Sequence, residues 1–195
     1  MLLFIIISII SFAGSMQVGV LSTNIIHTTL YHGKKQGYWV AMGGTLPELI
    51  YACIAILFTN TLATNTGFSQ IAALVVNLLF LGMGIYFLFL NPALKKASNT
   101  HSGKKYFLTG LTISGINPQL ILFWTGVAVY VQQLKVLSLK PFLHPVSFIA
   151  GAGFGALLLF HCIIIITYKN KSAVTDFIQK YQIYKLVGIA FIILS

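Results

Sequence analysis

Apolar stretches follow one another along most of the chain, and a helix of about 20 apolar residues spans the hydrocarbon core of a bilayer. We place six such spans at about 2–30, 38–58, 68–90, 106–131, 146–168 and 183–195. The first and fourth are longer than a straight span requires, so a tilted or broken helix is expected in each. The sequence therefore predicts an all-α, polytopic integral membrane protein.

Few residues carry a charge, and nearly all of those are basic. Charged residues make up 7% of the 195 residues, against about 25% in a typical soluble domain. The net charge is +10, and all twelve basic residues are lysines in short clusters between the apolar stretches. Such clusters are typical of segments beside anionic lipid headgroups. We expect membrane lipids as partners and no nucleic acid, because nucleic-acid binding needs a basic face on a soluble scaffold.

The distribution of the lysines predicts the orientation in the membrane. Ten of the twelve lie in the loops after the first, third and fifth spans, while Lys135 and Lys140 follow the fourth. Lysine-rich loops remain in the cytoplasm. Both termini are therefore predicted to lie outside, in a multi-pass protein of the inner (plasma) membrane.

The spans divide into two halves of three, at about 1–92 and 104–195, separated by the polar segment NPALKKASNTHSGKK. Because three is odd, a duplicated half would insert upside down, and such inverted repeats are common in transporters. Each half begins with an interrupted span, GSMQVGVLSTN in the first and GLTISGINPQL in the second. Interrupted segments in corresponding places indicate a binding site near the midplane. We therefore expect one transmembrane transporter domain over 1–195, built as a 3+3 inverted repeat.

Glu48 is one of only two acidic residues, and it lies near the middle of the second span. A charge there is costly, so the side chain should face protein or water. Gly44 and Tyr51 share its helix face; the glycine would leave room beside the carboxylate, and the tyrosine could donate a hydrogen bond to it. Pro47 removes the helical partner of the Gly43 carbonyl. Together these groups could bind an ammonium group, a cation or a proton; the alternative is a protonated glutamic acid that only packs.

The two interrupted spans supply the remaining candidate site residues, which are Gly19, Asn24, Asn117, Pro118 and Gln119. Pro118 lacks the N–H that the carbonyl of Ser114 would need in a continuous helix. In lipid such a carbonyl must find a neighbour, water or a ligand. For both segments the alternative is helix packing, with small residues in close contact and amides bonded across helices.

Other sequence features indicate helix packing or argue against an enzyme or a metal site. Gly151 and Gly155 form a GxxxG pattern, which is typical of helix packing and also permits a homodimer. His161 lies alone among apolar residues, where a neighbouring carbonyl usually satisfies such a side chain. The chain has no phosphate-binding glycine loop and no HExxH zinc motif, and two acids cannot build a magnesium site. We expect no cofactor, no metal site and no enzyme, a membrane-embedded enzyme being the less favoured alternative.

Several motifs together resemble the LysE/RhtB family of amino-acid exporters. The family's first hairpin is similar to VGVLSTNIIHTTLYHGKKQGYWVAMGGTLPELIYA, its third span to LGMGIYFLFL, and its asparagine–proline motif to GLTISGINPQLILFW. The matching positions are Gly33, Gly37, Gly43 or Gly44, Glu48, Gly84, Tyr86, Gly110, Asn117 and Pro118. One position departs from the pattern, because Val18 precedes Gly19 where the family usually has proline.

The resemblance implies a divergent member that exports amino acids or similar small metabolites, driven by a proton or ion gradient. The small-molecule substrate would bind between the interrupted spans, and Glu48 would carry the proton or contact the substrate ammonium. The Val18 departure supports the alternative, a non-transporting or degenerate membrane subunit.

Overall fold

The computed structural model describes residues 1–16, 19–64, 102–133 and 143–175, with isolated positions at 78, 81, 82, 85 and 189. Every regular element in this part of the chain is an α-helix, which confirms the all-α prediction. The predicted spans at 68–90 and 183–195, with Gly84 and Tyr86, lie almost wholly outside the described residues, as does Val18. The six spans and the inverted repeat therefore stay predictions.

The first and fourth predicted spans are both broken. Helix α1 (Leu2–Ser15) and helix α2 (Val20–His32) meet at an angle of 76°. Helix α5 (Gly103–Gly115) and helix α6 (Pro118–Gln133) meet at 62°. The expectation that these two stretches depart from a straight helix is confirmed.

Two other helices are continuous. Helix α3 (Lys34–Thr64) contains Pro47 without a break, and helix α7 covers Leu143–Lys169. Both are long and apolar enough to cross a membrane, and each broken pair also qualifies when it is counted as one span. Within the described residues, the structure thus contains two to four candidate spans.

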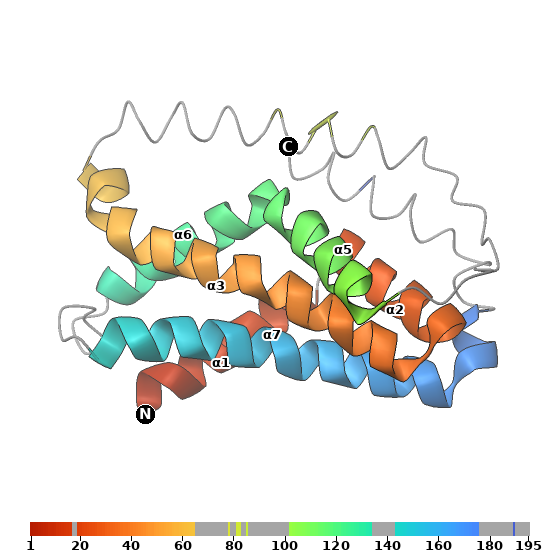
Figure 1. Cartoon of the computed structure of the whole chain (residues 1–195). Helices are drawn as coiled ribbons and strands as arrows, with labels where there is room; N and C mark the ends of the chain where they lie inside the picture. The colour runs from red at the N-terminus through yellow and green to blue at the C-terminus, as the bar shows by residue number, and fades with distance from the viewer. Residues whose placement is uncertain are drawn as a thin grey trace.

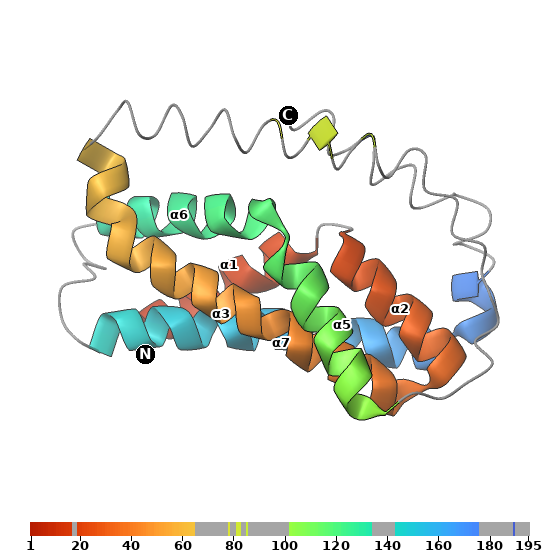
Figure 2. The same ribbon diagram turned by 45° about the horizontal axis from the view of Figure 1, so that its top comes forward.

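Helix α3 lies at the centre of the packing. It contacts α2, α5, α6 and α7, while α1 packs along α7 (Figure 1). Figure 2 shows α5 crossing the first half of α3. As a result, both broken pairs lie against the same central helix.

Two clusters of buried apolar side chains lie on either side of the middle of α3. One gathers around Trp124 and Phe148 and includes Ala52 and Ala55 of α3. The other gathers around Phe160 and Ile164 and includes Ala41 of α3. Glu48 therefore lies between two apolar layers, at the level where the broken helices change direction.

Glycines allow the closest helix contacts. A Cβ on Gly155 would overlap with the backbone of Ser8 in α1, and one on Gly151 would lie 2.8 Å from the carbonyl oxygen of Phe4. The GxxxG pattern thus packs α7 against α1 within one chain, as the packing interpretation expected. The homodimer remains a prediction.

Lysines from three separate loops gather at one end of the molecule. The turn between α2 and α3, the start of α5 and the end of α7 lie together, at the right of Figure 1. There Lys34 and Lys171 approach the ring of Tyr168 to 5.8 and 5.0 Å from its centroid. Gly33, with φ of 99°, ends α2 at this turn, in a backbone conformation that essentially only glycine adopts.

Candidate functional site

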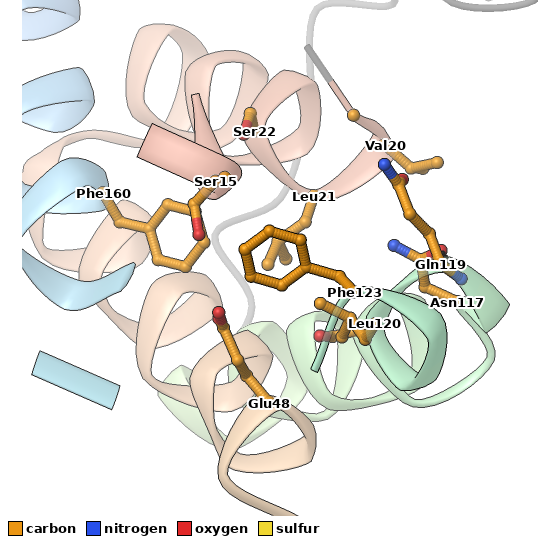
Figure 3. Close-up of a pocket in the computed structure, with 13 residues that line it drawn as sticks. Ser15, Val20, Leu21, Ser22, Glu48, Asn117, Gln119, Leu120, Phe123 and Phe160 are labelled. Atoms are coloured by element: carbon orange, nitrogen blue, oxygen red, sulfur yellow. Dashed lines mark hydrogen bonds between the residues drawn. The ribbon is translucent and has the colours of Figure 1, made fainter. Parts of the chain in front are cut away.

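A cavity lies where the two broken spans meet α3 (Figure 3). Its lining comes from the end of α1, the start of α2, Glu48 of α3, the end of α5 and the start of α6, with Phe160 of α7. The cavity volume is about 80 Å³. Because one water needs roughly 10–15 Å³, this volume has room for several waters or for the polar head of a small metabolite.

Glu48 brings a carboxyl group to this cavity and is only 3% exposed. Ser11 Oγ of α1 lies 3.4 Å from Glu48 Oε1 and 2.6 Å from the carbonyl oxygen of Ala152 in α7. A hydroxyl has one hydrogen, so Ser11 donates to one of these acceptors at a time. The Ser15 hydroxyl and the Trp124 indole N–H also face the carboxyl. Among the described residues, Glu48 is therefore surrounded by neutral hydrogen-bond donors.

The start of α2 brings backbone donors to the cavity that have no acceptor within the helix. Its N-cap is Gly19, which has no side chain to cap the helix. The N–H groups of the first turn, at Val20, Leu21 and Ser22, have no acceptor within the helix, and these residues line the cavity. The break in the first span thus presents the positive end of a helix dipole to the site.

The start of α6 is capped. Asn117 Oδ1 accepts a hydrogen bond from the backbone N–H of Gln119 at 3.1 Å, and the Asn117 carbonyl accepts one from Leu120 at 3.4 Å. Pro118 occupies the first helical position, where its missing N–H costs nothing. Asn117 therefore holds the break in place with its oxygen and retains its amide NH₂ as a donor.

The ring of Phe123 lies between the two polar parts of the site. In Figure 3 it separates Glu48 and Ser15 on one side from Asn117 and Gln119 on the other. The ring packs over Gly14, where a Cβ would overlap with it. Phe160 adds a second aromatic wall beside Glu48.

The structure brings together four of the eight predicted site residues: Gly19, Glu48, Asn117 and Gln119 all line the cavity. Pro118 lies between the last two as the first residue of α6. The other three, Gly44, Tyr51 and Asn24, do not line it. Asn24 accepts a hydrogen bond from Thr28 within α2 at 3.4 Å.

The carbonyl of Ser114 finds a neighbour, as expected, because the Asn117 N–H donates to it at 3.2 Å in a tighter turn. Two details of the predicted chemistry are corrected. The Tyr51 hydroxyl donates to the carbonyl oxygen of Gly115 at 2.6 Å and thereby joins α3 to the end of α5 instead of serving Glu48. Gly44 leaves no room beside the carboxylate, because the side chain of Leu21 fills that space.

The sequence interpretation missed Ser11, Ser15 and Trp124. A signal for the serines exists, because Ser8, Ser11 and Ser15 share one face of an otherwise apolar helix. For Trp124 no sequence signal exists, because it lies 76 positions from Glu48, and only the packing of α6 against α3 brings them together.

His161 has a partner outside this site. Its Nδ1 lies 2.7 Å from the Tyr38 hydroxyl, which joins α7 to α3. In the described ranges, no group of three or more histidine, cysteine, aspartate or glutamate side chains could hold a metal ion.

Comparison with known proteins gives one match. No curated protein and no solved structure matches the chain. A family model described as LysE type translocator matches residues 12–195, a range that includes both breaks and every residue of the cavity lining. The chain belongs to the LysE type translocator family and is a membrane transporter.

Proposed function

We propose that this protein is a secondary transporter that exports amino acids or similar small metabolites across the inner membrane, driven by a proton or ion gradient. One observation carries the proposal: the breaks of two interrupted spans and a buried carboxyl group line the same cavity. Transporters place substrate sites at such discontinuous helices, near the midplane. The gathered lysines support an orientation with that end in the cytoplasm.

The polar groups of the cavity suit the two charges of an amino acid. Glu48 can accept hydrogen bonds from an ammonium group, and the uncapped start of α2 can donate to a carboxylate. Of the residues that the structure describes, no lysine lines the cavity, so a carboxylate bound there would depend on backbone N–H groups and on the helix dipole. Leu21, Leu120 and Phe160 offer apolar surface to a substrate side chain.

The same carboxyl can couple transport to protons. Among the described residues that line the cavity, Glu48 is the one with an acidic side chain, and the hydrogen-bond donors around it are neutral. A proton and a substrate ammonium would then compete for one carboxylate. Loading one after the other on opposite sides of the membrane would give exchange, as one bundle moves against the rest.

The test is efflux of labelled amino acids from cells that express the chain, Glu48→Gln or Asp176→Asn. Glu48→Gln keeps the size of the side chain and removes its charge, and we expect it to abolish export or its dependence on pH. Asp176→Asn removes the only other acid of the chain and serves as the matched control. Export that is intact in both variants, with the same pH dependence, would exclude the role of Glu48.

A binding measurement tests separately the recognition of the substrate ammonium group and of the substrate carboxylate. We expect an amino acid to raise the thermal stability of the purified protein more than the amine that lacks its carboxylate or the acid that lacks its amino group. Equal stabilisation by all three, or by none across a broad panel, would argue against recognition of a zwitterion.

A further inference from the structure

The indole N–H of Trp124 is a buried hydrogen-bond donor without an acceptor at hydrogen-bond geometry in the described part of the chain. The side chain is fully buried, and its Nε1 has no hydrogen-bond partner among the described residues. Unpaired buried N–H groups are uncommon in native proteins, and each calls for an explanation. The acceptor that this N–H faces is the carboxyl of Glu48, at a geometry that falls short of a hydrogen bond.

Aromatic neighbours hold the indole in this position. Its ring makes edge contacts with Phe123 at 5.1 Å and with Phe148 of α7 at 5.5 Å between ring centroids. The indole N–H can only donate. A buried N–H that never meets an acceptor is costly, so the nitrogen needs an acceptor that is a strong one in at least one state of the protein.

We propose that Trp124 is a positioning residue that donates its N–H to Glu48 when the carboxyl is ionised, and that this bond weakens when the carboxyl takes up a proton. Hydrogen bonds to an ionised acceptor are shorter and about twice as strong as neutral ones. The loss of the proton therefore draws Trp124 of α6 toward Glu48 of α3. Phe123 precedes Trp124 in α6 and lines the cavity. A movement of Trp124 would therefore also move Phe123, so that protonation of Glu48 changes the wall of the substrate site.

In the described part of the chain, the groups that face Glu48, line its cavity or accept from Ser11 are neutral on every helix packed there. These are Ser11 and Ser15 of α1, Ser22 of α2, Ser114 of α5, Trp124 of α6, and the Ala152 carbonyl with Phe160 of α7. Three titratable side chains lie within three positions of a lining residue: the free thiol of Cys162 and two that have other partners. His161 pairs with Tyr38, and Tyr51 pairs with the Gly115 carbonyl.

This proposal rests on the proposed function in one respect, which is that protonation of Glu48 has a role in transport. The bond itself is measurable in the purified protein. The chain has two tryptophans, so Trp39→Phe leaves Trp124 as the single indole N–H signal after ¹⁵N labelling. We expect this signal to move downfield as rising pH removes the proton from Glu48, and to stay fixed in Trp39→Phe/Glu48→Gln.

A signal that is independent of pH, or one that moves equally in the Glu48→Gln protein, would overturn the proposal. Both of the compared proteins, Trp39→Phe and Trp39→Phe/Glu48→Gln, retain Trp124. The result therefore does not depend on how well a Trp124 variant folds. A moving signal in a protein that exports nothing would support the Trp124 bond and overturn the transport proposal.

Transport supplies the second readout. Trp124→Phe keeps a smaller aromatic ring at this position and removes the donor. A charge-assisted hydrogen bond of ordinary strength corresponds to about a tenfold preference for the ionised form, or about one pH unit. We expect Trp124→Phe to shift the midpoint of the efflux pH profile upward by about that amount. An unchanged midpoint with a lower rate would indicate a structural role only and would overturn the proposal.

Discussion

The contact between α3 and α5 depends on two glycines that carry no polar chemistry. A Cβ on Gly110 would overlap with the carbonyl oxygen of Val40 and would lie 2.9 Å from Gly44 N. A Cβ on Gly43 would overlap with the carbonyl oxygen of Phe107. Ordinary contact begins at 3.4 Å, and the obstructing atoms are backbone. An alanine at either position must therefore push the two helices apart.

We predict that Gly110→Ala destabilises the protein relative to Gly126→Ala. Gly126 lies inside α6 with nothing within 4 Å of its added Cβ. Both substitutions bring the same gain in helix propensity, up to about 1 kcal/mol, so their difference isolates the overlap. The shift needed at Gly44 N is at least 0.5 Å, from 2.9 to 3.4 Å, and it is larger at the carbonyl oxygen. Overpacking of this kind costs about 1–3 kcal/mol.

The measurement is the free energy of unfolding in mixed micelles, from titration with a denaturing detergent. Gly43→Ala should behave like Gly110→Ala, because it meets the partner helix in the same way. If both variants are as stable as Gly126→Ala, the two helices do not approach as closely as described, and the placement of the α5 end at the cavity is also wrong.

Three further substitutions test the breaks and turns. Asn117→Ala removes the cap of α6 and should cost about 0.5–2 kcal/mol, whereas Asn117→Asp keeps the capping oxygen; equal stability of the two would show that the cap contributes nothing. Tyr51→Phe removes the bond to the Gly115 carbonyl and should cost about 0.5–1.5 kcal/mol while it lowers efflux, and a variant with unchanged stability and efflux would contradict that link between α3 and α5. Gly33→Ala forces a side chain into a backbone conformation that costs about 1–3 kcal/mol, and an unfolding midpoint equal to that of the unmodified protein would refute this. All three are read in the same micelle titration, with the unmodified protein as the reference.

The sequence alone predicted the breaks, because a break depends on local chemistry. Pro118 cannot continue a helix, and Asn117 is a favoured cap before it. Gly14, Ser15 and Gly19 weaken the first span in the same local way. These properties act within one turn of the chain, so the broken spans and Gly19, Glu48, Asn117 and Gln119 could be named without a structure.

The sequence did not predict which groups each polar atom contacts. Tyr51 shares a helix face with Glu48, yet it bonds to the end of α5. Gly44 does not open space for the carboxylate, because Leu21 from α2 fills that space. Both outcomes depend on side chains that come from other helices, and single-sequence spacing carries no information about them.

The amino-acid sequence by itself determined that this is a helical membrane protein with two interrupted spans and one buried acid. Those properties follow from hydropathy, from the cost of a charge in lipid and from the chemistry of proline and glycine. Only the tertiary structure decided that both interruptions and Glu48 line one cavity, and that Ser11, Ser15 and Trp124 face the carboxyl. The physical reason is that these contacts come from close packing between helices distant in sequence, made possible by glycines whose partners only the folded chain supplies.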